Sequence, residues 1–213
     1  MELLYEEKIK GNKQGFKKKL LEIASQLEFN PNWLMAVFKK ESNVNPQARN
    51  TKYLVNGKPA TGLLQWVENT AQEKHQLSVD DIYQLDGIAQ LDLVYAYFKP
   101  VAHRITKYSD LYRYVFFPVS LGKDSDYVFQ TRSLSAERVA QQNPVIDLNK
   151  DHQITNTEFE EYALAGIKEP FKTQFRSQAK DSATKFAKRN RSQIVIGAIV
   201  LLLSLYLFYT FFI

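Results

Sequence analysis

The stretch NPNWLMAVFKKESNVNPQARN, residues 30–50, decides the fold, together with ATGLLQW at residues 60–66. Asn30 is a good helix cap, and Pro31 occupies the first helical position, where proline is favoured. Apolar side chains then recur at helical spacing, at Trp33, Leu34, Val37 and Phe38. The pattern predicts a helix from Asn30 to about Ser42, because Asn45-Pro46 disfavours its continuation.

One acidic residue, Glu41, lies at the carboxyl end of this predicted helix. The negative end of the helix dipole and apolar surroundings both disfavour ionisation, so we expect the pKa of the Glu41 carboxyl to be raised. A carboxyl that stays protonated near neutral pH is able to donate its proton to a glycosidic oxygen. The same spacing also fits a solvated glutamate at a helix end, so the pattern alone leaves both interpretations open.

The other predicted elements are helical too, and the predicted fold class is mainly α. Apolar spacing indicates helices at Phe16–Phe29 and Asp86–Phe98. Ser78 begins a capping-box pattern, and Ser109 is expected to cap a further helix. The exception is Tyr53–Lys58, where Asn-Gly between apolar residues is typical of a small β-hairpin.

Composition allows a packed domain and excludes several kinds of chemistry. The chain has 213 residues, of which 45% are hydrophobic and 13% aromatic, so there is room for one ordinary domain and an appendage. There is no cysteine, which excludes disulfides and cysteine-based metal or redox sites. The three histidines are far apart in sequence without metal-ligand spacing, so zinc is not expected.

The positive charge of the chain is concentrated in one segment near its carboxyl end. Residues 168–191 contain eight Lys or Arg against two Asp or Glu, and the last 22 residues carry no charge. The rest of the chain is therefore almost neutral, which argues against a nucleic-acid-binding domain. We expect residues 168–193 to form a basic helix beside a membrane surface, with a solvated helix as the alternative.

The segment IVIGAIVLLLSLYLFYTFFI, residues 194–213, has the composition of a transmembrane helix. Twenty uncharged residues span roughly 30 Å as a helix, about the thickness of a bilayer core. Positive flanks stay on the cytoplasmic side. The charged amino terminus, MELLYEEKIKGNK, does not fit a secretion signal. These features predict a single-pass membrane protein with a C-terminal anchor and a cytoplasmic domain.

The sequence DLNKDHQITNTE, residues 147–158, matches the spacing of an EF-hand calcium loop. The expected ligands are side-chain oxygens of Asp147, Asn149, Asp151 and Glu158 and the backbone carbonyl of Gln153. His152 stands where the loop needs a positive φ and usually has glycine, which predicts weaker affinity. The alternative is an acidic turn that caps the helix Thr157–Leu164. We expect a structural Ca²⁺ site in a module of residues 144–167.

Several motifs, in their order, resemble those of the lytic transglycosylase and goose-type lysozyme clan. They are Glu41-Ser42, Asn45-Pro46, Gly62-Leu-Leu-Gln65 and Thr70-Ala71. The segments QLDLVYAYFKP, SDLYRYVFFPVSLGK and DYVF, and the terminal calcium-type loop, are similar to those of phage-borne peptidoglycan transglycosylases. The likeness covers residues 20–162. It implies that residues 1–143 form a lysozyme-like domain.

The resemblance implies an enzyme that cleaves MurNAc–GlcNAc β-1,4 bonds, with Glu41 as general acid and then base. Ser42 and Gln65 would position the saccharide and the acid. Trp66 has two interpretations, stacking on a sugar ring or filling the core. A late Ala-Tyr-Asn-x-Gly motif of the clan is replaced here by FPVSLG, residues 117–122. Candidates for the missing tyrosine hydroxyl are Tyr95, Tyr97 and Tyr114.

Three functions remain open at this point. A single acid favours an intramolecular reaction that gives an anhydro product without water, as the resemblance implies. A hydrolytic lysozyme that acts at release is one alternative. The other is a non-catalytic glycan-binding or structural virion protein.

The predicted topology places the enzyme domain on the side of the membrane opposite the wall. An internal membrane of a phage virion resolves this conflict, because the domain would then lie between lipid and capsid until entry. The expected partners are peptidoglycan strands, the lipid bilayer and other virion or capsid proteins. The host cytoplasmic membrane is the alternative location.

Overall fold

The computed structural model describes residues 2–178, and they fold mainly as helices, as predicted. The helices are α1 (Lys13–Leu27), α2 (Pro31–Ser42), α3 (Glu68–His75), α4 (Val79–Gln84), α5 (Gly87–Phe98), α6 (Tyr108–Phe116), α7 (Ala136–Gln142) and α8 (Asn156–Leu164). Short 3-10 turns are η1 (Glu6–Lys8), η2 (Lys99–Arg104) and η3 (Pro118–Ser120). One antiparallel hairpin joins β1 (Arg49–Val55) and β2 (Lys58–Thr61).

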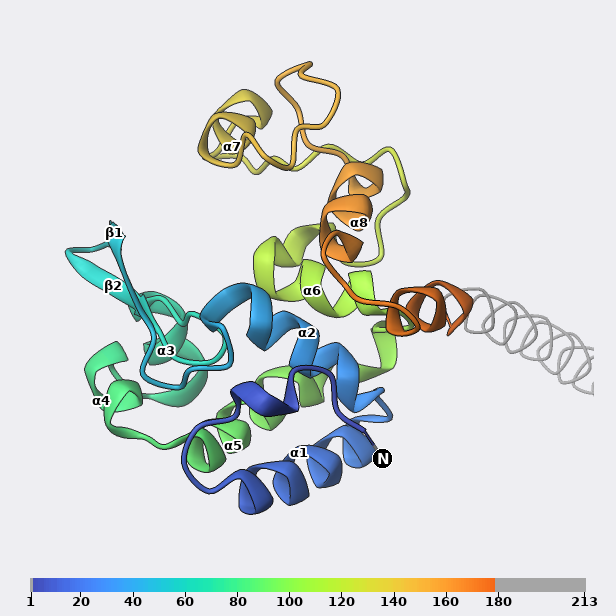
Figure 1. Ribbon diagram of the computed structural model, residues 1–213. Helices are drawn as coiled ribbons and strands as arrows, with labels where there is room; N and C mark the ends of the chain where they lie inside the picture. The colour runs from blue at the N-terminus through green and yellow to red at the C-terminus, as the bar shows by residue number, and fades with distance from the viewer. Residues whose placement is uncertain (1, 179–213) are drawn as a thin grey trace, which may run out of the picture.

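Helix α2 is the central element of the core. It runs through the middle of the molecule, with α1 and α5 on one side and α6 on the other (Figure 1). Five consecutive residues, Leu34 to Phe38, have no exposed surface. A helix that is buried on all sides needs packing partners all round, so α2 fixes the positions of its neighbours.

Most of the predicted elements are confirmed, and their ends have the predicted chemistry. Asn30 caps α2, since its side-chain oxygen accepts from Asn32 N at 2.9 Å. Ser78 and Asp81 form the predicted capping box of α4. The turn of the hairpin has positive φ at both Asn56 (53°) and Gly57 (75°), as a two-residue turn of type I′ requires.

The predicted cap at Ser109 is wrong. Helix α6 begins at Tyr108 after Lys107, so Ser109 lies inside the first turn, and its buried hydroxyl has no hydrogen-bond partner. The start of α6 is instead fixed by Asp110. One carboxylate oxygen of Asp110 accepts from both Thr106 N (3.0 Å) and Thr106 Oγ1 (2.8 Å).

Aromatic rings join α8 to the body of the domain. The ring of Phe159 lies 5.2 Å from that of Tyr112, 5.1 Å from that of Phe116 and 5.5 Å from that of Phe129. Just before α8, Phe129 N donates to Ile154 O at 2.8 Å. Because each edge-on or tilted ring pair stabilises beyond its buried area, α8 is held firmly against α6.

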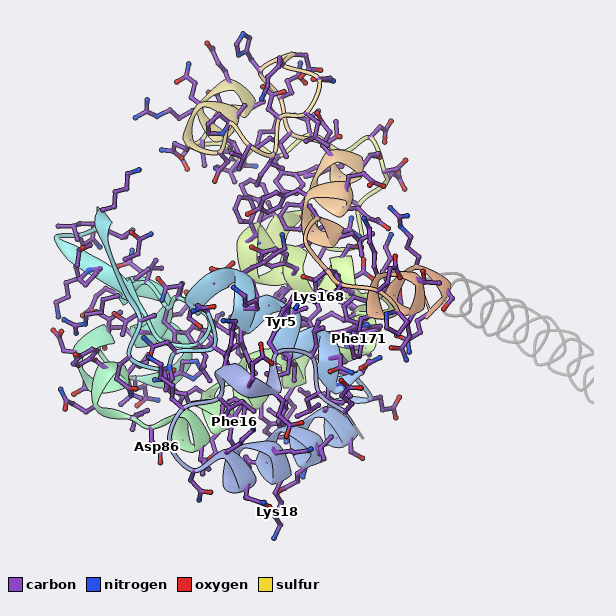
Figure 2. The ribbon with its side chains drawn as sticks, viewed as in Figure 1. Tyr5, Phe16, Lys18, Asp86, Lys168 and Phe171 are labelled. Carbon is purple, nitrogen blue, oxygen red and sulfur yellow. The ribbon has the colours of Figure 1, made fainter. Side chains whose placement is uncertain are left out.

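The segment after α8 returns to the body of the domain. Phe175 is buried, and its ring lies 4.9 Å from that of Tyr108. Figure 2 shows Tyr5 beside the segment that carries Lys168 and Phe171, and the Tyr5 hydroxyl donates to Gly166 O at 3.2 Å. The start of the predicted basic helix is therefore packed on α6.

The predicted membrane span at residues 194–213 lies outside the described residues. Between residues 2 and 178, no helix is long and apolar enough to cross a bilayer.

Gln90 of α5 joins the loop before β1 to the turn after β2. Its side chain is completely buried, and its Nε2 donates to Pro46 O at 2.7 Å, with Ile82 O at 3.1 Å as a second acceptor. Its Oε1 accepts from Leu63 N at 2.8 Å. Gly62 is required beside it, because a Cβ there would lie 2.6 Å from Gln90 Oε1.

Replacing Gln90 by Met should lower the free energy of unfolding by about 3 kcal/mol, because at least two buried backbone groups lose their partner. Urea unfolding followed by circular dichroism measures the change. The matched control is Gln72→Met on the exposed face of α3, which should stay within about 0.5 kcal/mol of wild type. Equal stability of the two variants would contradict the role assigned to Gln90.

Candidate active site

Glu41 lies in the last turn of α2, which ends between the base of the hairpin and α6 (Figure 1). The helix is closed by Asn43 and Val44, both with positive φ (55° and 60°). Their amides donate to Lys39 O and Phe38 O. A positive φ is strained for a β-branched residue such as Val44. Val44 is buried, and such strain persists only where the surrounding structure enforces it. The helix end that carries Glu41 is therefore rigidly built.

The environment of Glu41 raises its pKa to about 7, and burial of the carboxyl is the main cause. Two groups oppose this effect by favouring the carboxylate, namely the hydroxyl of Tyr112, which hydrogen-bonds it, and the charge of Lys40. The residue as a whole is half-buried. The predicted rise in pKa is thus present, with burial rather than the helix dipole as its principal source. Near neutral pH such a carboxyl is able both to donate and to accept a proton.

Two tyrosines of α6 face Glu41, and the sequence analysis did not identify either. The hydroxyl of Tyr112 favours the charged form of Glu41, and the buried hydroxyl of Tyr108, one turn earlier, has no hydrogen-bond partner. Their rings are stacked 6.4 Å apart. Burial raises the pKa of both phenols, and the charge of Glu41 raises them further. The i, i+4 spacing of the two tyrosines was the signal in the sequence, since it puts them on one helix face.

Two of the candidate substrate-binding residues, Trp66 and Tyr97, lie in the core. Trp66 is only 3% exposed, and its ring lies 4.9 Å from Tyr97 and 4.8 Å from His75. Tyr97 donates its hydroxyl to Tyr114 O at 3.1 Å. Both side chains fill the core between α3, α5 and α6, which is the packing interpretation of Trp66. Tyr95 is half-buried, with Lys99 Nζ 5.4 Å from the centre of its ring.

Ser42 braces the helix end against the turn at residues 62–65, and Gln65 holds that turn together. The buried hydroxyl of Ser42 lies 2.9 Å from Phe38 O and 3.1 Å from Leu63 O. Gln65 has a positive φ of 52°, and its Nε2 donates to Gly62 O at 3.0 Å. The role of these residues in positioning the saccharide and the acid stays a prediction. The bond from the Ser42 hydroxyl to Phe38 O is the local bond to its own helix that a serine near a helix end can form.

The loop at residues 147–158 has a positive φ at His152, the position where the calcium pattern needs one. His152 has a φ of 65°, and its amide donates to Asp147 Oδ2 at 3.2 Å. Asn149 Oδ1 accepts from Asp151 N, and Asp151 Oδ1 accepts from Gln153 N, both at 2.9 Å. The other oxygen of Asp147, Oδ1, is buried and has no partner. A buried carboxylate oxygen without a donor fits a cation at this position.

Glu158, the last predicted ligand, is engaged by the loop itself. Its Oε1 accepts from Leu148 N at 3.0 Å, and its Oε2 accepts from the amide and the hydroxyl of Thr155, both at 2.9 Å. In the part of the chain that the structure describes, no three His, Asp or Glu side chains gather closely enough to hold a metal ion. Glu158 would therefore have to exchange these bonds to bind one.

Comparison with known protein families finds a match to part of the chain. Residues 20–105 match the family model of the transglycosylase SLT domain, and the match contains α2 with Glu41, the hairpin and α5. No curated protein matches the chain. Members of the SLT family are lytic transglycosylases that act on peptidoglycan, so a glycan strand of peptidoglycan is the implied substrate. Residues 20–105 therefore carry a transglycosylase SLT domain, which supports the lytic transglycosylase and lysozyme-like family for this segment.

Proposed function

We propose that this protein is a peptidoglycan lytic transglycosylase that cleaves the MurNAc–GlcNAc β-1,4 bond, with Glu41 as its acid and base. The observation that carries the proposal is the pKa of about 7 of a half-buried carboxyl at the end of α2, inside the segment that matches the SLT family. A general acid is most effective when its pKa lies near the working pH.

Glu41 would act twice in the reaction. Protonated Glu41 donates its proton to the glycosidic oxygen as the bond to the anomeric carbon breaks. The 6-hydroxyl of the same MurNAc then attacks the anomeric carbon, and the Glu41 carboxylate takes up the proton of that hydroxyl. The product is a 1,6-anhydro sugar, no water is consumed, and the enzyme regains its proton. Tyr112, which favours the carboxylate, stabilises Glu41 between the two transfers.

The charges around Glu41 favour this route over hydrolysis. Among the residues that the structure describes, the charged side chain that shifts the pKa of Glu41 is Lys40, a cation. Most hydrolytic glycosidases use a second carboxyl group, about 5–5.5 Å away in retaining enzymes or about 6.5–9.5 Å away in inverting ones. A single acid suits a substrate that supplies its own nucleophile.

Purified sacculi provide the test of the catalytic proposal. The full chain in detergent should release muropeptides with anhydro ends, identified by mass spectrometry. Glu41→Gln should lower the rate at least 100-fold, the smallest usual contribution of a general acid. The wild-type rate should fall as the pH rises through about 7, because the donating form of Glu41 is lost.

Glu22→Gln on the exposed face of α1 is the matched control and should keep the wild-type rate. Reducing ends in place of anhydro ends would favour the hydrolytic lysozyme. Tight binding to sacculi without release of muropeptides would favour the non-catalytic glycan-binding module.

We also propose that the loop at residues 147–158 binds Ca²⁺ as a structural ion. Asp147, Asn149, Asp151, Glu158 and the carbonyl of Gln153 would hold it. The support is the loop backbone and the buried, unpartnered Asp147 Oδ1. The ion would neutralise the loop carboxylates and fix the start of α8.

Calcium should therefore stabilise the protein. At a free concentration 100 times the Kd, binding contributes about 2.7 kcal/mol, which raises Tm by roughly 5 to 11 °C. Glu158→Gln should weaken binding at least 10-fold in calorimetric titration, whereas Glu137→Gln on the exposed surface of α7 should leave it unchanged. An unchanged Tm in millimolar Ca²⁺ would contradict the site.

We further propose that residues 194–213 anchor the protein in a bilayer, in a phage virion with an internal membrane or otherwise in the host cytoplasmic membrane. The support is the run of twenty uncharged residues after a segment with eight basic residues. In the virion the enzyme would open the host wall locally at entry.

Alkaline carbonate extraction of membranes tests the anchor. The protein should stay with the lipid, and replacing Leu202 and Leu203 by Arg should release it, because charges at the bilayer centre are costly. Release of the wild-type protein would contradict the anchor. Recovery only from the periplasm of uninfected bacteria would contradict the virion.

A further inference from the structure

Lys40, the residue before Glu41, is bound to a residue 122 positions later in the chain. Its Nζ donates to Tyr162 O at 2.9 Å and lies 4.3 Å from the centre of the Tyr162 ring. The side chain is half-buried, and burial lowers the pKa of its ammonium group. Immobilising a long lysine side chain costs conformational entropy, so the fold stabilises one particular place for this charge.

That place is beside the acid. The charge of Lys40 favours the carboxylate of Glu41 and so opposes the effect of burial. The other titratable groups that face Glu41 are the phenols of Tyr112 and Tyr108 on α6. From α8, the ring of Tyr162 stacks on that of Tyr112, with 6.4 Å between their centres. Lys40 thus contributes the positive charge in this set of side chains.

We propose that Lys40, held by the carbonyl and the ring of Tyr162, is a positioning residue that sets the charge balance of Glu41. This inference rests on the proposed function only for the role of Glu41 as the acid. The contacts between Lys40 and Tyr162 do not depend on it. It gives α8 a role in holding the charge that precedes Glu41, although α8 lies outside the segment that matches the SLT family. Tyr162 acts through Lys40, and neither residue needs to touch the substrate.

Carboxyl ¹³C NMR of the full chain in detergent tests the proposal, with Glu41→Gln to assign the resonance. In Lys40→Met, which keeps an apolar stem without the charge, the titration midpoint of Glu41 should rise by roughly one unit. Lys40→Arg should restore the wild-type midpoint. The matched control is Lys39→Met, since Lys39 Nζ lies instead over the Tyr5 ring at 5.8 Å.

Tyr162→Leu, which lacks the ring, tests the contribution of α8. The midpoint of Glu41 should rise part of the way towards that of Lys40→Met, and the double variant should titrate like Lys40→Met alone. A wild-type midpoint in Lys40→Met overturns the proposal, and so does an additive double variant. A merely structural role would change stability without moving the midpoint.

This experiment is independent of the proposed enzymatic activity. If the wild-type protein leaves sacculi intact while Lys40→Met shifts the midpoint, the proposed function fails and the positioning role stands. If sacculi are cleaved and the midpoint does not move, the function stands and the positioning role is wrong.

Discussion

The burial of one carboxyl at the end of α2 is the constraint on which the rest of the site depends. Raising the pKa of Glu41 from 4.5 to about 7 means that its charged form costs the folded state about 3 kcal/mol. Because the folded pKa is the higher one, this part of the stability is complete below pH 4.5 and is lost as the pH rises to 7. The fold therefore gives up stability at neutral pH to keep a proton available.

The surrounding structure holds this unfavourable arrangement in place. Gln90 ties the turn after β2 to the core, and Ser42 ties the same turn to the helix end. Val44 has a strained, positive φ, and this backbone conformation helps to end α2 just after Glu41. Each contact is an ordinary buried hydrogen bond, and the site depends on all of them because a buried polar group without a partner is costly.

Helix α8 connects the two chemically distinctive parts of the chain. At its first turn, Glu158 closes the loop that carries the calcium pattern. Further along, Phe159 and Tyr162 pack on Tyr112, and Tyr162 holds Lys40. The same helix thus contacts the loop at one end and the neighbours of Glu41 near the other.

The sequence by itself determined the helical class, the limits of α2, the hairpin turn and the position of Glu41, because these depend on local spacing, caps and turns. It also indicated the positive φ at His152, because the calcium loop pattern needs a positive φ at that position. Only the tertiary structure decided which tyrosines meet the acid, that Trp66 lies in the core, and that Lys40 binds Tyr162. Those outcomes join residues far apart in the chain, and periodicity within one helix carries no information about the helix packed against it.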